Sequence, residues 1–238
     1  MPQAPPPANE IVTSSVEATS ILQPPKLDGT LDDPLWQLAR PITDFRQREP
    51  QEGQPATEKT EVQIVYTRHA VYFGIHCYDS KASGIVATEL RRDVSQELDD
   101  HFEILIDSNH DRRGAYVFQI SPLGTQKDGL IVEEAGDSNG GDFDSGWDGV
   151  WTSEARIGSG GWTATVEIPF KTLNFTRSEN VIWGLNLKRF IRRKNEEDLW
   201  QAYERRFGIT KVSQAGTLNG IRDIGSGSSA DLRFWTRS

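Results

Sequence analysis

Apolar residues recur at every second position along much of the chain, with polar residues between them. The segments that follow this pattern are residues 62–66, 71–77, 102–106, 116–120, 162–168 and 183–187. A period of two is typical of β-strands that bury one face. Turn-rich stretches separate the segments, and no long amphipathic helix is visible. The pattern predicts an all-β fold, an antiparallel β-sandwich of two packed sheets. The residues expected between the sheets include Ile104, Phe118, Val166 and Leu185.

The composition changes near both ends of the chain. Residues 1–25 are rich in Pro, Ala, Ser and Thr and have little periodicity, which predicts a disordered tail. Asp33 and Pro34 then form a helix-start signal, because Asp caps a first turn and Pro suits its first position. Residues 213–238 are interpreted as a linker because they contain the Gly-Ser run 225–229. The sandwich is therefore expected over residues 26–212.

Charge and hydropathy narrow the function classes. The chain has 26 basic and 35 acidic residues, a net charge of −9, which argues against a nucleic-acid partner. No apolar run approaches the roughly 18 residues of a spanning helix. The first residues lack the charged and apolar regions of a signal peptide. The sequence leaves open whether the protein stays inside the cell or begins after a removed signal.

Five parts of the sequence resemble one known family. They are residues 26–36, 99–107, 161–170 and 183–186, and Trp200. In this order they resemble the family 9 carbohydrate-binding modules over residues 26–212. The resemblance implies a β-sandwich that binds carbohydrate without catalysis, often with structural calcium. It also implies a clamp of two tryptophans around the sugar, of which Trp200 resembles the later one. Where the earlier one belongs, this chain has residues 89–93, without a tryptophan.

A narrower resemblance comes from residues 49–53, 91–93, 147–151 and 186–196. They are similar to a subgroup of unknown function in which such a module precedes a predicted outer-membrane β-barrel. This implies export to the periplasm or the outer-membrane surface, and a natural chain that continues into a barrel beyond residue 238. The alternative function is then an accessory domain that docks onto its own barrel and binds no sugar.

Arginines take the place of the missing tryptophan, and their forked guanidinium groups suit carboxylates. This favours acidic or anionic glycans as ligands. The residues expected to form one polar cleft with an aromatic wall are Trp200, Arg91, Arg92, Asp93, Asn186, Arg189, Arg193 and Glu196, with Trp147 at the surface nearby. Arg189 is in phase with the apolar residues of its strand, so we expect it to emerge at the strand end or at a bulge. The alternative is a structural ion-pair network of these arginines with Asp93, Asp99, Asp100, Glu196 and Glu197.

An acidic, Gly-rich loop is the candidate metal site. Its oxygen ligands for structural calcium, the one cofactor considered, are Asp137, Asn139, Asp142 and Asp144. The alternative is a solvated loop. Catalysis finds no support, because the sequence has neither a nucleophile motif nor a convincing carboxylate pair. His101 and Glu103 share a strand face and are interpreted as solvent-facing residues.

Overall fold

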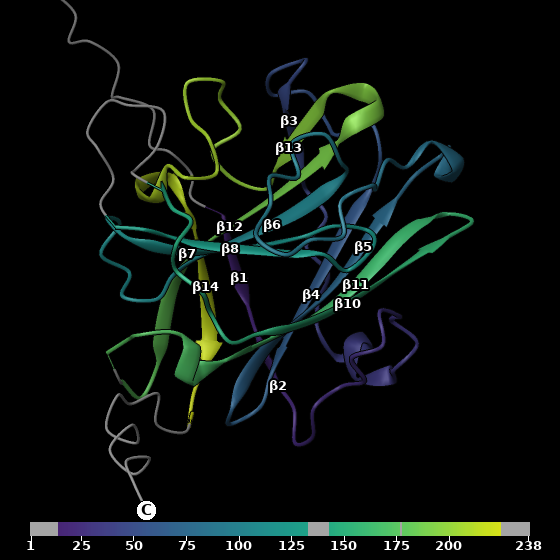
Figure 1. Ribbon diagram of the computed structural model, residues 1–238. Coiled ribbons are helices and arrows are strands. Elements are labelled where there is room, and N and C mark those ends of the chain that lie inside the picture. The colour runs from purple at the N-terminus through teal and green to yellow at the C-terminus, as the bar shows by residue number, and fades with distance from the viewer. Residues whose placement is uncertain (1–13, 133–142, 177, 225–238) are drawn as a thin grey trace, which may run out of the picture.

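A computed structural model describes residues 14–132, 143–176 and 178–224 as two stacked β-sheets (Figure 1). The nine-stranded sheet contains β1 (Ser15–Glu17), β3 (Arg46–Glu49), β6 (His101–Asp107), β7 (Ala115–Ile120), β8 (Gln126–Ile131), β9 (Phe143–Asp144), β12 (Val181–Ile191), β13 (Glu196–Leu199) and β14 (Gly216–Ile221). The five-stranded sheet contains β2 (Thr19–Ser20), β4 (Thr60–Tyr66), β5 (Ala70–Tyr78), β10 (Thr152–Gly158) and β11 (Gly161–Pro169). The predicted β-sandwich is confirmed.

Antiparallel pairing dominates both sheets. The strand order is β1-β14-β12-β6-β7-β8-β9 in the larger sheet and β10-β11-β5-β4-β2 in the smaller one. The long strand β12 pairs with β6 along one edge, while its other edge pairs first with β14 and then with β13, which in turn pairs with β3. Two short pairings, β1 with β14 and β2 with β4, are parallel.

The sandwich extends beyond both predicted domain boundaries, because short strands lie before residue 26 and after residue 212. Residues 15–20 belong to β1 and β2, although the composition of residues 1–25 predicted a tail. Residues 216–221 form β14, inside the segment predicted to be a linker. Leu218 and Ile221 are fully buried, so a chain-end segment contributes to the core. Composition alone missed these strands because they are short and gain their hydrogen bonds from distant partners.

The main core lies between the sheets and is built from the predicted strand faces. Ile104, Phe118, Val166 and Leu185 are each at most 1% exposed, as the alternation predicted. Trp183 packs edge-to-face against the rings of Phe170 and Phe175 in the same core. Burial of this apolar surface is the main force that holds the two sheets together.

The outer face of each sheet is partly covered by a loop segment. The 3₁₀ turn η1 (Pro34–Leu38) begins at Asp33, whose carboxylate accepts the N–H of Leu35 at 3.0 Å, as predicted. Its Trp36 lies on the smaller sheet against Gly74, where a Cβ atom would sit 2.7 Å from the indole. On the larger sheet, Ile209 and Val212 of the segment before β14 cover part of the outer face around Leu105.

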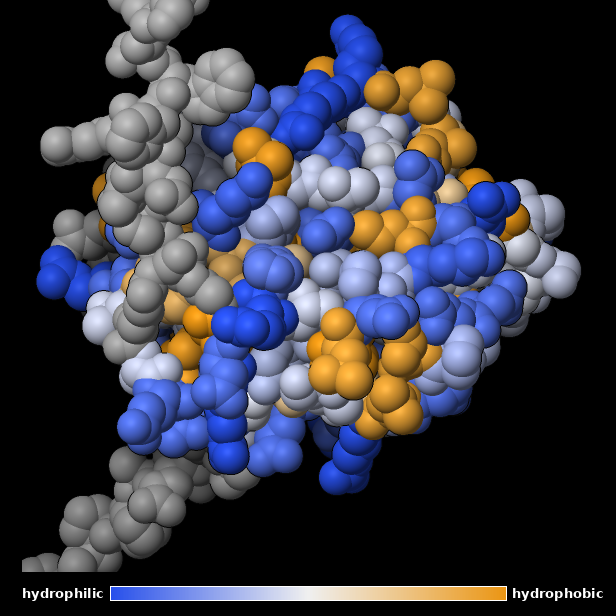
Figure 2. Space-filling view, turned by 90° about the horizontal axis from the view of Figure 1, so that it is seen from below, coloured by the Kyte–Doolittle hydropathy of each residue, from blue (hydrophilic) through white to orange (hydrophobic). Residues whose placement is uncertain are grey.

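The remaining helical elements in the described residues are short 3₁₀ turns: η2 (Ala82–Gly84), η3 (Phe170–Thr172), η4 (Arg192–Lys194) and η5 (Val212–Gln214). The helices found in the described part of the chain are too short and too polar to cross a bilayer. In the view of Figure 2, polar and charged residues cover most of the surface, and apolar residues form small separate groups. Scattered apolar side chains of this kind need no partner.

Arg189 is a charged side chain inside the sandwich. It lies on β12 in the apolar phase, is fully buried, and neither emerges at the strand end nor sits on a bulge, so that expectation was wrong. Its guanidinium group instead crosses to the smaller sheet. It donates to the carbonyl oxygens of Lys59 at 3.0 Å and Tyr78 at 2.7 Å, and to the Thr60 hydroxyl at 3.1 Å. The positive charge is tolerated because polar oxygens of β4 and β5 surround it.

Asp198 lies directly opposite Arg189 in the β12–β13 pairing and is also fully buried. Burial, together with the neighbouring Glu196 carboxylate, raises the pKa of Asp198 to about 8. A carboxyl group with such a pKa is protonated at neutral pH. The arginine therefore has its hydrogen bonds to the smaller sheet as its main stabilising contacts.

We predict that Arg189→Met lowers the free energy of unfolding by about 2–4 kcal/mol, measured by urea denaturation at pH 7. The loss is expected because the substitution removes the three hydrogen bonds that the guanidinium group donates to the carbonyl oxygens of Lys59 and Tyr78 and to the Thr60 hydroxyl. Arg206→Met is the matched control, since this side chain is 70% exposed and its replacement should change stability by less than about 0.5 kcal/mol. Equal stability of the Arg189 variant and the wild type would show that the bridge between the sheets is dispensable.

Candidate functional site

Four polar side chains form a row across the outer face of the nine-stranded sheet. They are Lys188 of β12, Glu103 of β6, Gln119 of β7 and Lys127 of β8. Each is the direct cross-strand partner of the next, so the strand register alone places them side by side. Three inter-strand spacings give the row a length of about 14 Å.

A second, shorter row runs beside the first. Phe190 of β12 is opposite His101 of β6, and their rings lie 5.2 Å apart. On its other side Phe190 is opposite Glu197 of β13, which forms an ion pair with Arg48 of β3 at 3.3 Å. The two rows together join a half-buried aromatic ring to several charged groups.

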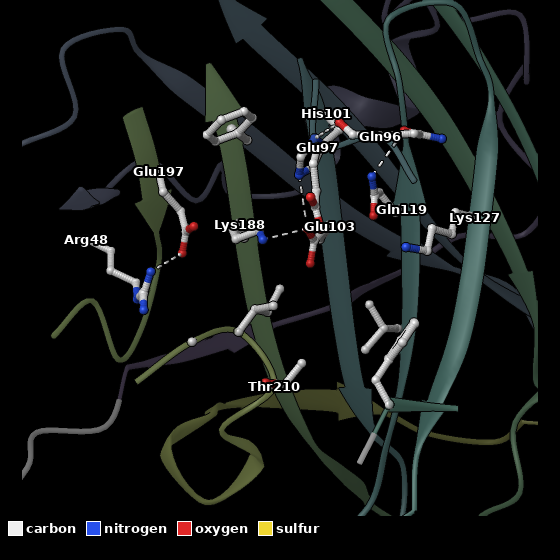
Figure 3. A pocket seen from close by; sticks show the side chains of 15 residues that line it. Arg48, Gln96, Glu97, His101, Glu103, Gln119, Lys127, Lys188, Glu197 and Thr210 are labelled. Carbon is white, nitrogen blue, oxygen red and sulfur yellow. Dashed lines mark hydrogen bonds and ion pairs between the residues drawn. The ribbon is translucent and has the colours of Figure 1, made fainter. Parts of the chain in front are cut away.

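These rows form the floor of a pocket with a volume of about 360 Å³ (Figure 3). Gln96 and Glu97 of the loop before β6 form one wall, and Ile209 and Thr210 of the segment before β14 form another. Phe143 of β9 closes the end near β8. The volume lies within the range of small-ligand sites, about 300–1,000 Å³.

The centre of the pocket is a buried carboxylate held between two nitrogen donors. Glu103 is 7% exposed, and its Oε1 lies 2.6 Å from the Lys188 ammonium and 3.1 Å from Nε2 of His101. Burial alone would raise the pKa of Glu103, but Lys188 and His101 outweigh it and lower the pKa to about 2. The carboxylate in turn raises the pKa of Lys188. Both charges therefore persist at neutral pH.

The His101 ring is oriented by the backbone beneath it. Its Nδ1 lies 3.1 Å from the carbonyl oxygen of Gln96 and 3.0 Å from that of Asp99. Because Nε2 faces the Glu103 carboxylate, both ring nitrogens point at acceptors. Gln96 also accepts a hydrogen bond from Gln119 at 3.2 Å. The polar floor is thus held in place before any ligand arrives.

Lys127 is the basic group of the row without a carboxylate partner among the described residues. Its ammonium lies 5.5 Å from the ring centre of Phe143, a cation–π contact. Lys188 and Arg48, in contrast, are each paired with a glutamate. Lys127 is therefore the cation best placed to meet a negative group on a ligand.

The structure does not bring the predicted cleft residues together. Arg91 is exposed and pairs with Glu89 at 2.9 Å. Arg92 turns toward β8 and pairs with Asp128 at 2.9 Å and with Asp148 at 2.7 Å. Arg189 lies between the sheets, as described above, and so belongs to neither the cleft nor the outer pocket.

The other predicted polar residues also have structural partners elsewhere. Arg193 contacts Glu58 and Asp79, each at 2.6 Å. Glu196 is buried and accepts hydrogen bonds from the backbone and the hydroxyl of Thr57. Asn186 is buried and pairs with the backbone of Gln201. Asp93 contacts Arg92 at 3.2 Å. The alternative of ion pairs describes these arginines better. Of the partners predicted for it, Asp93 contacts Arg92, whereas the other ion pairs of Arg91, Arg92 and Arg193 involve carboxylates that were not predicted.

The two candidate aromatic residues pack inward. Trp200 is 7% exposed and belongs to the main core, so it cannot act as the aromatic wall of a sugar site. Trp147 is half-buried and packs on the rings of Tyr116 and Phe118. The prediction of a single cleft with a tryptophan wall was therefore wrong, because both indoles are used in packing.

Three residues of the predicted calcium loop, Asp137, Asn139 and Asp142, lie outside the described residues. The fourth, Asp144, is exposed and its carboxylate accepts the N–H of Gly146 at 2.8 Å. Calcium binding by this loop stays a prediction.

A different group of carboxylates converges near β8. Oxygen atoms of Asp93, Asp128 and Asp148 lie within 4.8 Å of one another. The Arg92 guanidinium contacts all three, so an arginine already supplies the positive charge at this point. The group is therefore explained as an ion-pair cluster.

None of the residues predicted for the cleft lines the outer pocket. The sequence did contain a signal for this pocket. His101 and Glu103 share the polar face of one strand, and Lys188 lies on the polar face of another. The missing information was the register, which places Glu103 opposite Lys188.

Comparison with known proteins identifies relatives of this fold. A family model described as carbohydrate family 9 binding domain-like matches residues 27–203. No curated protein sequence matches the chain.

Solved structures with the same fold have low sequence identity to this chain. A family 9 carbohydrate-binding module from Caldicellulosiruptor kristjanssonii in complex with cellotriose is 14% identical, with a TM-score of 0.60 over 88% of this chain and 96% of that chain. Its complex with glucose is also 14% identical, with a TM-score of 0.61 over 88% and 98%. A proposed carbohydrate-binding protein from Bacteroides uniformis is 10% identical, with a TM-score of 0.67 over 88% and 100%. At these identities the similarity shows the fold alone.

The depressed pKa of Glu103 predicts how the protein responds to acid. A lowered pKa contributes stability that is present above the ordinary glutamate pKa and is lost as the pH falls through about 2. In Lys188→Met the main neighbouring charge is gone and the pKa of Glu103 rises. The midpoint of acid unfolding, followed by tryptophan fluorescence, should then move up by on the order of one pH unit.

Lys171→Met is the control for this experiment, since Lys171 is an exposed lysine of η3. Adding Glu103→Gln to the Lys188 variant should abolish the shift, because the titrating group is then absent. An unchanged midpoint in the Lys188 variant would contradict the assigned electrostatics.

Proposed function

The chain belongs to the carbohydrate family 9 binding domain-like family, and from this premise we propose that it binds carbohydrate, without catalysis, in the pocket on the outer face of the larger sheet. The observation that carries the proposal is the row from Lys188 to Lys127, which joins ionic and amide groups on one pocket floor. Sugars present closely spaced hydroxyl groups. A rigid surface of charged donors and acceptors is suited to bind them.

The strength of such a site can be judged from its hydrogen bonds. A micromolar complex needs about 8 kcal/mol. A hydrogen bond to a charged group contributes about 1.5–3 kcal/mol, so about three to five of them are required. Lys188, Glu103 and Lys127 offer charged groups, and Gln119 adds an amide. The ordering cost is reduced because Glu103 is already fixed by its two neighbours.

An aromatic clamp contributes nothing to this proposal. The resemblance implied two tryptophans around the sugar, but Trp200 is part of the core. The described residues that line the pocket include Phe190 and Phe143 as aromatic rings. Binding at this site therefore depends more on hydrogen bonds than on stacking. A ligand rich in polar groups fits it better than one recognised mainly by its ring faces.

The electrostatics support binding rather than catalysis. Glycoside hydrolysis needs a carboxylic acid that holds its proton near neutral pH, which requires a raised pKa. The pKa of Glu103 is lowered to about 2 by the adjacent ammonium and imidazole. This carboxylate is thus an acceptor for hydroxyl groups and is a poor proton donor.

The ligand class that fits best is an acidic or anionic glycan. Lys127 has no carboxylate partner among the described residues, and it lies at the end of the row beside Phe143. A sugar carboxylate placed over Lys127 would form a new ion pair without breaking an existing one. This support comes from the pocket and not from the arginines that the sequence suggested.

Glycan binding is tested on a glycan array followed by titration calorimetry on the best ligand. We expect Gln119→Ala to weaken binding about tenfold, equivalent to about 1.4 kcal/mol, because one hydrogen-bonding group of the floor is lost. Lys171→Ala, an exposed change away from the pocket, should bind like the wild type. Unchanged affinity of a folded Gln119 variant would place the site elsewhere, and no binding to any glycan would reject the function.

The preference for acidic sugars has its own test. Lys127→Met should weaken binding of a uronic acid trisaccharide about tenfold and that of a neutral hexose trisaccharide by less than about twofold. The preference of the wild type should also fall with added salt, because exposed charges are screened. Equal affinity of the wild type for both sugars would contradict the anionic preference while leaving carbohydrate binding intact.

Export to the periplasm or outer-membrane surface, and docking onto a barrel of the same chain, stay predictions from the narrower sequence resemblance. A protein that binds no glycan but binds that barrel would favour the docking alternative.

A further inference from the structure

A second row of polar side chains crosses the outer face of the five-stranded sheet, on the opposite side of the sandwich. It consists of Glu61 of β4, His76 of β5, Thr163 of β11 and Arg156 of β10. As in the first pocket, each residue is the direct cross-strand partner of the next. The row has the same length of about 14 Å, three inter-strand spacings. The proposed function uses none of these residues.

The row is the floor of a cavity of about 640 Å³, larger than the first pocket. Residues 30–32, which precede η1, form one wall. The turn between β10 and β11, residues 158–161, forms another. Hydrogen bonds from Arg156 Nε to the carbonyl oxygen of Asp28 and from Thr163 to that of Gly29, each at 2.6 Å, hold the segment before this wall on the sheet. The cavity is thus a built feature of the fold.

The side chains of the cavity are held in defined positions. The rings of His76 and Tyr78 are stacked, with centroids 3.6 Å apart and planes 19° apart. Tyr78 donates its hydroxyl proton to Glu61 at 2.7 Å, and Lys59 pairs with the same carboxylate at 2.6 Å. Burial lowers the pKa of His76, so its neutral ring offers one donor and one acceptor at neutral pH.

One polar side chain of this cavity, Gln63, has an amide oxygen without a hydrogen-bond partner among the described residues. The residue lines the cavity and is 9% exposed, yet its Oε1 has no hydrogen-bond partner in the part of the chain that the structure describes. A buried amide oxygen left unpaired costs free energy, and a rotation of the amide toward the cavity would let a ligand hydroxyl recover it. The unpaired amide is therefore a second indication of a ligand site, besides the cavity itself.

The charges select the kind of ligand. The cavity lining contains the carboxylates of Asp32 and Glu61 and the guanidinium of Arg156, which is already engaged by a backbone carbonyl. A strongly anionic ligand is therefore disfavoured, in contrast to the first pocket, where Lys127 has no carboxylate partner in the described part of the chain. Hydroxyl groups suit the carboxylate, amide, imidazole and hydroxyl of the floor, whereas the Tyr78 ring is already in contact with His76 and with the Lys59 ammonium, 5.0 Å from its centre.

We propose that this cavity is a second binding site, which takes a short segment of neutral oligosaccharide through Glu61, Gln63 and His76. The choice of sugar as the ligand rests on the proposed function, whereas the site itself rests on the cavity and its unpaired amide. Because the two sites lie on opposite outer faces, one chain would join two separate glycan strands.

The test uses the intact 238-residue chain, labelled for NMR, with four probes: the trisaccharides of the cello-, xylo-, manno- and malto-series. At least one probe is expected to shift the side-chain signals of His76, Tyr78 and Gln63. In the same titration, His76→Ala should weaken binding at this face about tenfold. Gln119→Ala on the opposite face is the matched control and should leave these shifts unchanged.

The outcomes separate this inference from the proposed function. Shifts confined to residues around Glu103 and Gln119 would overturn the second site and leave the first intact. Shifts confined to His76, Tyr78 and Gln63 would support the second site, and the first site, which is expected to prefer acidic sugars, would then be decided by the uronic acid trisaccharide. If His76→Ala fails to fold, the wild-type shifts decide alone, and no shift on this face with any of the four probes overturns the proposal.

Discussion

The alternation of side chains along paired strands is the constraint on which the rest of this structure depends. Each strand must direct its apolar residues into the shared core, so its polar residues are directed to an outer face. A slip of one residue would exchange the two faces, and the buried Phe102, Ile104 and Ile106 of β6 prevent it. With the register set, polar residues of adjacent strands line up in rows. Both candidate sites are such rows, and their positions follow from the packing of the core behind them.

Charges inside the protein play two different parts in this arrangement. Arg189 occupies an apolar position and ties the larger sheet to backbone oxygens of the smaller one. Glu103, Lys188 and His101 instead line a pocket, where mutual attraction keeps the carboxylate ionised. Buried charge is costly unless it is paired. In the first case the pairing holds the fold together, and in the second it holds a polar surface ready for a ligand.

The fold is shared with a family 9 module whose solved structures hold cellotriose and glucose. The tryptophan that resembled part of a sugar clamp is used to fill the core, with its ring against Gly216 of β14. The outer pocket has phenylalanine rings, a paired carboxylate and a lysine that has no carboxylate partner among the described residues. The core and the outer face are set by different residues, so a shared fold does not specify the groups that a pocket presents.

The sequence by itself indicated packed β-sheets, because strands with a period of two in apolar residues must bury one face against another element, and the chain has no long helices to cover it. It also indicated residues that fill the core, including Ile104, Phe118, Val166 and Leu185. It indicated that His101 shares a face with Glu103, but it could not say that Lys188 completes the group. That contact depends on a pairing across 85 residues of chain, from position 103 to position 188, and cross-strand register is a property of the packed sheets.

Only the tertiary structure decided where the charged residues lie and which partners they contact. Arg92 and Arg189 are equivalent in charge, yet one pairs with carboxylates at the surface and the other with carbonyl oxygens inside. Trp200 was assigned to a sugar site because its position in the sequence matched a motif, and its burial depends on β14, which composition had assigned to a linker. Alternation specifies the face on which a side chain lies. Whether that face is open to a ligand or covered depends on segments that are distant in the sequence.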